Sequence, residues 1–174
     1  MCGKWHLGPP GPVERGFDEY FGMVHGFDSF WDHTKYTRLP EGRPMRTYPE
    51  GKFYATDAIT DHALDFLKIS RERGKPVFFY LAYNAPHFPL HAPKEVIDRY
   101  ASVYEKGWDH IREQRYRRMR EMGLLHSGWE FTPRSTIPPN RVATPHGWAN
   151  KQNPAWDSID ADRRADLARR MAVY

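Results

Sequence analysis

Residues 2–8, Cys-Gly-Lys-Trp-His-Leu-Gly, place a permanent cation beside a titratable imidazole. In an extended segment side chains alternate between two faces, so Lys4 and His6 would point one way and Trp5 the other. A lysine next to a histidine suits an oxyanion that must be held and must then exchange a proton. The alternative is a strand edge with Trp5 in the core and two solvated polar residues. These seven residues alone favour that alternative.

A second candidate, His87, lies in a stiff loop over residues 84–93 that contains three prolines. Proline fixes its own φ and pushes the preceding residue into an extended conformation. The loop follows an apolar run, residues 77–83, which is too short for a helix and predicts a strand buried on both faces. Ligands bind at the carboxyl ends of such strands, so His87 is a candidate catalytic residue. The alternative is a loop histidine bonded to the backbone, and the residues leave the two evenly balanced.

Three other features predict structure rather than chemistry. His87 and His91 have the spacing of a helical metal pair, but the surrounding prolines exclude a helix, so we expect no zinc site. Cys2 has no thiol-protease context and is expected to be a small buried residue. The arginine-rich stretch over residues 109–121 predicts a solvated helix that contacts carboxylates. A nucleic-acid surface is the less favoured interpretation of that stretch.

Length and composition are those of a globular protein. The chain has 174 residues, which is enough for one domain with a core. Its net charge of +4 favours anionic ligands without indicating nucleic acid. The single cysteine excludes an internal disulfide, and no apolar run reaches the length of a membrane span.

The clearest predicted element is a helix that Thr56 caps and that ends near Arg73, with Gly74 at its C-terminal cap. Its apolar face carries Ile59, Ala63, Phe66 and Leu67. Further helices are expected over residues 94–106, from Asp109 to about Gly123, and from a cap at Asp160 onward. Loops are expected over residues 9–16, 17–31, 38–52 and 124–157. A helix packed on a buried strand predicts an α/β fold with a mostly parallel sheet flanked by helices.

Two motifs in this order resemble those of the sulfatase family. Residues 3–8 (Gly-Lys-Trp-His-Leu-Gly) look like the family's second signature. Residues 85–90 (Ala-Pro-His-Phe-Pro-Leu) look like its proline-flanked histidine loop. Residues 16–18, 107–112 and 170–174 also fit the family pattern, so the resemblance spans the whole chain.

The resemblance implies a partial sulfatase fold, related to alkaline phosphatase, that hydrolyses sulfate esters. It implies one partial catalytic domain over residues 1–174, truncated at both ends. By the same resemblance, Lys4 would bind the sulfate and the hydroxyl of the nucleophile. His6 would take the proton from the sulfated aldehyde hydrate and so expel sulfate, and His87 would contact the ester oxygen and help protonate the leaving alcohol.

The family's nucleophile and metal motifs are missing from this sequence. The formylglycine nucleophile arises in a Cys/Ser-x-Pro-x-Arg motif, and calcium or a similar divalent ion is bound by an aspartate pair and an Asp-Asn pair. Neither Cys/Ser-x-Pro-x-Arg nor Asp-Asn-Gly occurs here, so we assign no metal ligand and expect the chain alone to be inert. The implied partner is a sulfated small molecule or carbohydrate, with no nucleic acid and no membrane span. The sequence does not indicate the compartment, and the resemblance is compatible with a periplasmic or secreted protein.

Two further functions remain open at this point. Lysine and histidine do not separate sulfate from phosphate by charge, so a phosphate or phosphonate ester hydrolase of the same superfamily is one alternative. A degenerate member that only binds anions through Lys4, His6 and His87 is the other. Three aromatic residues either line a substrate pocket or pack in the core or on the surface: Trp31, Tyr36 and Trp148.

Overall fold

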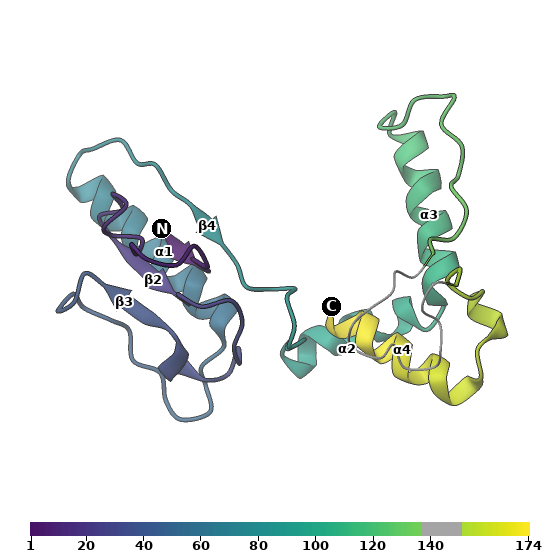
Figure 1. The fold of residues 1–174 in the computed structure, drawn as a ribbon, viewed down its shortest axis with the longest axis horizontal. Coiled ribbons are helices and arrows are strands. Elements are labelled where there is room, and N and C mark those ends of the chain that lie inside the picture. The colour runs from purple at the N-terminus through teal and green to yellow at the C-terminus, as the bar shows by residue number, and fades with distance from the viewer. Residues whose placement is uncertain (137–150) are drawn as a thin grey trace. The chain divides into compact units, whose positions relative to one another are not determined.

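The structure, a computed structural model, describes residues 1–136 and 151–174 (Figure 1). These residues form two compact units, residues 1–91 and residues 92–173. Each unit contains buried hydrophobic residues of its own. The single domain expected over residues 1–174 stays a prediction. Trp148 lies outside the described residues.

A four-stranded open sheet organises the first unit, in the order β3-β2-β1-β4. Its strands are β1 (Cys2–Gly3), β2 (Tyr20–Gly22), β3 (Thr37–Leu39) and β4 (Leu81–Ala82). The central strand β1 is parallel to both β2 and β4, and β3 is antiparallel to β2. The predicted α/β class and mostly parallel sheet are therefore confirmed. The prediction of only loop over residues 17–31 is wrong at β2, whose short run of aromatic residues is buried by pairing with β1 and β3.

Helix α1 (Ala55–Glu72) starts earlier than its sequence indicates. Its N-cap is Tyr54, which makes no side-chain capping bond, and Thr56 lies inside the first turn. The backbone N–H of Ala55 instead donates to the carbonyl of Phe30 at 2.8 Å, so a distant loop satisfies a group that a capping side chain would otherwise bind. The predicted C-terminal glycine is confirmed, since Gly74 takes a φ of +62° directly after the C-cap.

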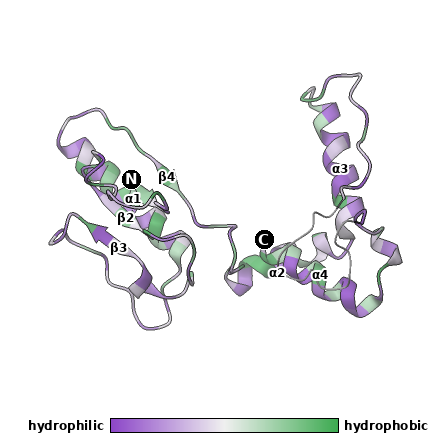
Figure 2. Cartoon of the chain, in the orientation of Figure 1, coloured by the Kyte–Doolittle hydropathy of each residue, from purple (hydrophilic) through white to green (hydrophobic). Residues whose placement is uncertain are grey.

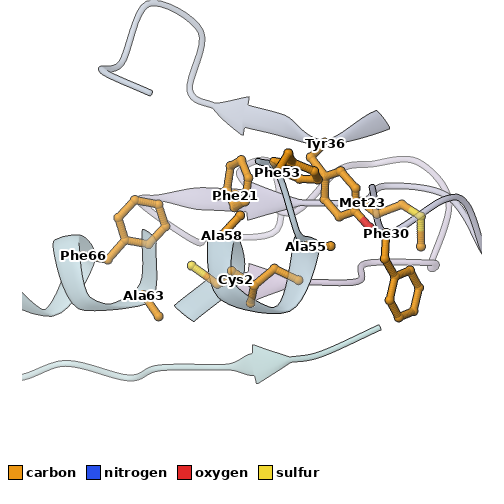
Figure 3. Close-up of a cluster of buried hydrophobic side chains, with 11 residues drawn as sticks. Cys2, Phe21, Met23, Phe30, Tyr36, Phe53, Ala55, Ala58, Ala63 and Phe66 are labelled. Carbon is orange, nitrogen blue, oxygen red and sulfur yellow. The ribbon is translucent and has the colours of Figure 1, made fainter. Parts of the chain in front are cut away.

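The buried face of α1 packs on the sheet (Figure 3). In that view Cys2 and Phe21, from two neighbouring strands, lie beside Ala58 and Phe66 of the helix. The buried residues of α1 are Ala55, Ala58, Ile59, His62, Ala63 and Phe66. Leu67, which the periodicity places on this face, is 40% exposed, so the prediction is wrong there.

His62 is a buried histidine that the hydrophobic pattern did not identify. It is 1% exposed, and its ring lies 3.6 Å from that of Phe21 with an interplanar angle of 5°. Its Nδ1–H donates to the carbonyl of Ala58 at 2.9 Å, which fixes the ring on the helix. Burial lowers the pKa of His62, because the imidazolium would lose its hydration in the core.

The apolar run over residues 77–83 is not the doubly buried strand that its composition predicts. Only Leu81–Ala82 pairs as a strand, and Val77, Phe78 and Tyr80 are 52%, 82% and 49% exposed. These side chains are exposed because β4 is an edge strand. Among the described residues it pairs with β1 on one side and with no strand on the other.

The second unit consists of α2 (Lys94–Tyr104), α3 (Gly107–Glu121) and α4 (Ala161–Val173). Helix α2 packs against α4. The predicted cap on α4 is confirmed, because Asp160 Oδ1 accepts from the backbone N–H of Arg163 at 2.8 Å. Among the described residues, no helix has both the length and the hydropathy needed to cross a membrane.

Asp109 does not cap α3. The helix begins two residues earlier, at Gly107, whose φ of +79° suits glycine, and Asp109 lies in the first turn. Its carboxylate accepts from the backbone N–H of Trp156 at 2.9 Å and from Arg134 at 2.9 Å, so it joins two segments to α3. These contacts hold the pKa of Asp109 below its usual range. Irregular structure in the described part of residues 124–157 is broken only by the bridge Thr136–Gln152 and a 3-10 turn, Trp156–Ser158.

We expect the free energy of unfolding to fall as pH is lowered from 7 to 5. The folded-state pKa of His62 lies below the unfolded value, so below about pH 6.5 the unfolded chain binds more protons. The loss from one such group is at most about 1.4 kcal/mol per pH unit. Urea unfolding at pH 7, 6 and 5 would show a smaller loss for His62→Phe, which retains an aromatic ring against Phe21. The exposed His33→Gln should keep the wild-type slope, and an unchanged slope in His62→Phe would contradict this account.

We expect the exposed segment beside β4 to drive self-association. Placing a charge there, with Phe78→Lys, should shift the chain toward the monomer with little effect on folding, because Phe78 is 82% exposed. Light scattering after size-exclusion chromatography would measure the change. Leu64→Lys is the matched control, since Leu64 is 58% exposed on α1. Equal effects of the two substitutions on self-association would show that the exposed residues before β4 have no special role in it.

Candidate functional site

Three segments with chemistry-bearing residues lie at one edge of the sheet. Because β2, β1 and β4 run parallel, the residues that follow them emerge at the same edge. Residues 4–6 follow β1, residues 24–27 follow β2, and residues 84–88 follow β4 (Figure 1). The sequence-predicted residues Lys4, His6 and His87 therefore belong to neighbouring strand ends.

Backbone hydrogen bonds hold the segment after β1 between its two neighbours. The N–H of Lys4 donates to the carbonyl of Ala82 at 2.7 Å, and the N–H of Trp5 donates to that of Met23 at 2.9 Å. Trp5 is buried with Met1 and Tyr20, whereas Lys4 is half-buried. In the described part of the chain, the Lys4 ammonium has neither a hydrogen bond nor an ion pair. A half-buried cation without a partner is available for an external anion.

His6 departs from the extended geometry that the sequence predicts. The regular strand ends at Gly3, and His6 takes a φ of +53°, in the left-handed region. Its N–H donates to the carbonyl of Val24 at 3.1 Å, which ties this turn to the segment after β2. The imidazole is exposed, and its Nε2 faces Gly26 so closely that a Cβ there would lie 2.7 Å away.

His87 is held by its own loop and by one aromatic neighbour. Its N–H donates to the carbonyl of Asn84 at 2.9 Å, and its Nδ1 lies 2.5 Å from the carbonyl of Phe88. A carbonyl only accepts, so Nδ1 carries the proton, and Nε2 is the nitrogen left to accept or donate a proton. The ring stacks on Phe27 with centroids 6.1 Å apart and planes at 13°.

The segment after β2 is the common neighbour of both histidines. Val24 bonds the backbone of His6, Gly26 borders the His6 ring, and Phe27 stacks on His87. Gly26 and Phe27 were not among the residues predicted from the sequence, because they fall in residues 17–31, where only a loop was expected. The signal that could have identified them is the strand that precedes them, since three parallel strand ends must share one edge.

The buried side-chain amide of Asn84 anchors the loop of His87 to the core. Asn84 is 4% exposed, and its Nδ2 donates to the hydroxyl of Tyr36 at 2.9 Å. Tyr36 is itself buried and packs in the core, so it does not line a substrate pocket, and burial raises the pKa of its hydroxyl. Asn84 therefore joins the backbone of His87 to the core.

Trp31 is 43% exposed and contacts Tyr54 at a centroid distance of 4.7 Å.

Two remaining candidates are structural. Cys2 is fully buried, as predicted, and burial raises its pKa to about 12, so the thiol stays protonated at neutral pH. His91 uses Nδ1 to accept the backbone N–H of Phe30 at 3.3 Å, so this nitrogen is not open to a metal. Residues 1–136 and 151–174 contain no group of three His, Cys, Asp or Glu side chains able to hold a metal ion.

The chain is similar in sequence to proteins of one family. A family model described as Sulfatase matches residues 1–123. An uncharacterized sulfatase of Schizosaccharomyces pombe is 32% identical over 189 residues, which cover 100% of this chain and 31% of that protein. An arylsulfatase of Klebsiella aerogenes is 32% identical over 188 residues, covering 100% of this chain and 36% of its own. The chain thus spans about a third of the length of these two relatives.

Shorter matches extend over part of the chain. The N-acetylgalactosamine-6-sulfatase of Mus musculus is 31% identical over 127 residues, which cover 65% of this chain and 24% of that protein. Among solved structures, one described as "Crystal structure of Ps i-CgsB" aligns with a TM-score of 0.47 and 29% identity, over 56% of this chain and 26% of that one.

We expect Gly26→Ala to displace the His6 ring. The added Cβ would lie 2.7 Å from Nε2, closer than any real contact, and the exposed ring can move away at a cost of about 1 kcal/mol. The ring signals of His6 in ¹H–¹³C NMR spectra should shift, and those of His87 should follow if Phe27 moves with residue 26. Gly128→Ala is the matched control, because its Cβ would lie at an ordinary 3.4 Å from His126 Nδ1. Unchanged His6 signals in Gly26→Ala would contradict the geometry.

Proposed function

This chain belongs to the sulfatase family, and on that premise we propose that Lys4, His6 and His87 form the sulfate-binding part of an active site that hydrolyses sulfate esters. One observation carries the proposal: His6 and His87, 81 positions apart in the sequence, both border residues 24–27. Lys4 leaves the central strand at the same edge, two residues before His6. These are the residues at which the two family motifs match the sequence.

Each side chain has a chemical role in this proposal. The Lys4 ammonium neutralises the negative charge of the sulfate. This attraction is strong because Lys4 is half-buried and pairs with no carboxylate among the described residues. His6 accepts a proton at its imidazole when sulfate departs. In its imidazolium form His87 carries a second proton on Nε2 and donates it to the oxygen of the leaving alcohol, while Nδ1–H stays bound to the carbonyl of Phe88.

Family membership also implies a metal ion and a modified nucleophile, and the described residues do not fit either group. They contain no metal-ligand cluster, and the single cysteine is buried and stays protonated. We therefore propose that the chain by itself binds the anion without turning over the ester. The substrates we propose are sulfated small molecules or sulfated carbohydrates. The second of these follows the name of the N-acetylgalactosamine-6-sulfatase relative.

Binding of inorganic sulfate to the chain tests this proposal without the missing groups. Sulfate titration should shift the NMR signals of Lys4, His6 and His87 together. Lys4→Met should weaken binding at least tenfold, because it removes the only fixed charge among the three. Lys35→Met is the matched control, since Lys35 lies on an exposed turn, His33–Lys35, and should bind as wild type.

Three results would contradict the proposal. Sulfate that shifts none of the three residues, or an equal loss with Lys4→Met and Lys35→Met, would remove the assignment of the site. Hydrolysis of 4-nitrophenyl sulfate by the purified chain, with no complementing fragment, would refute the proposal that it is inert alone. A parallel titration with phosphate separates the phosphatase alternative, which predicts that the phosphate ion binds more tightly than sulfate.

A further inference from the structure

A hollow lies within residues 92–173, against one side of α3. Its volume is about 660 Å³, which is within the range of small-molecule sites. Helix α3 supplies one wall, and the segment over residues 125–132 supplies the other. Figure 1 shows the chain after α3 running back alongside that helix. Three aromatic rings line it: Tyr116, Trp129 and Phe131.

Direct bonds tie the outer wall to the helix. The Tyr116 hydroxyl donates to the carbonyl of Trp129 at 2.7 Å, and Arg120 donates to that of Ser127 at 3.2 Å. Arg112 donates to the hydroxyl of Thr132 at 2.9 Å. These bonds come from three successive turns of one helix, so the hollow is formed before any ligand arrives. A ligand therefore binds without the entropic cost of ordering the segment.

The rings of this hollow are held in place but incompletely covered. Phe131 lies under the Arg112 guanidinium at 4.4 Å and beside Tyr116 at 5.0 Å. Even so, Phe131 is 43% exposed and Trp129 is 60% exposed. The backbone carbonyl of Trp129 is held by the Tyr116 hydroxyl, and Trp129 lines the hollow, so its large flat ring is presented from a fixed backbone.

One arginine at the hollow has a free charge. The hydropathy colours in Figure 2 show α3 as mostly hydrophilic, but several of its guanidinium groups are already engaged. Arg112 and Arg120 bind backbone carbonyls, and Arg117 pairs with Glu113 at 2.6 Å. Arg115 lines the hollow and has no acceptor among the described residues. Glu130 is the one carboxylate in the lining.

We propose that this hollow binds a ring-bearing sulfate monoester, with its sulfate on Arg115 and its ring on Trp129. The choice of sulfate as the anion rests on the proposed function of the chain. The geometry of the hollow is independent of that proposal. A guanidinium binds a sulfate through two parallel N–H···O bonds, and an aromatic face packs against a flat ring. One free guanidinium suits a single negative charge. A nucleic acid would need several cations along its backbone.

Paired ligands test the proposal on the chain itself. The probes are phenyl sulfate with phenol, and galactose 6-sulfate with galactose, so the arms separate an aryl ester from a sugar ester. We expect the indole N–H signal of Trp129 to shift with at least one sulfated probe and to respond at least tenfold more weakly to its unsulfated partner. Arg115→Gln should weaken binding of that sulfated probe at least tenfold. Arg118→Gln, an exposed position of α3 outside the lining, should change it less than twofold.

Four outcomes would overturn the proposal. They are no shift at Trp129, equal binding of sulfated and unsulfated probes, equal losses in Arg115→Gln and Arg118→Gln, and tighter binding of a short RNA that Arg115→Gln abolishes. The same titrations in Lys4→Met separate this proposal from the proposed function. A Trp129 response that persists there supports the second site, whatever happens at His6 and His87.

Discussion

Close parallel pairing of β1 between β2 and β4 is the constraint on which the first unit depends. A Cβ on Gly3 would lie 1.8 Å from the carbonyl oxygen of Ala82, and one on Gly22 would lie 1.9 Å from that of Gly3. Gly3 also has a φ of +106°, which other residues rarely adopt. Glycine at these two positions is what lets three backbones run together. Since the candidate site is made of the residues that follow the three strands, its geometry depends on the same pairing.

Each histidine is positioned by groups outside its own motif. His6 is placed by a left-handed turn and by the absence of a side chain at Gly26. His87 is placed by Phe27 and by the backbone of Asn84, whose amide is bonded to the buried Tyr36. A buried amide that lost this partner would retain the cost of desolvation, so the pair stabilises one arrangement of the loop. The two imidazoles are thereby connected through residues 24–27 and through the core beneath.

Many of the arginines that make the chain basic bind internal partners in the folded structure, so their charge is not directed at an external ligand. Arg38 pairs with Glu19 in the first unit, both nearly buried, and Arg134 joins Asp109 in the second. The arginines of α3 bind carbonyl oxygens more than the carboxylates that the sequence predicts. Most of the guanidinium groups in the described residues thus bind internal partners, whereas Arg115 lines the hollow beside α3 without one.

The amino-acid sequence alone determined the main helices, the burial of Cys2, the cap at Asp160 and the residues to consider for chemistry. These depend on periodicity, capping and motif spacing, which act between residues close in the chain. Tertiary structure decided the short strand β2, the exposure of residues 77–83, and the meeting of His6 with Gly26 and of His87 with Phe27. A strand's burial and a loop's neighbours depend on which distant segments pair with it, and no local pattern encodes that partner. The same apolar run that would be buried in the middle of a sheet is exposed here, because β4 lies at its edge.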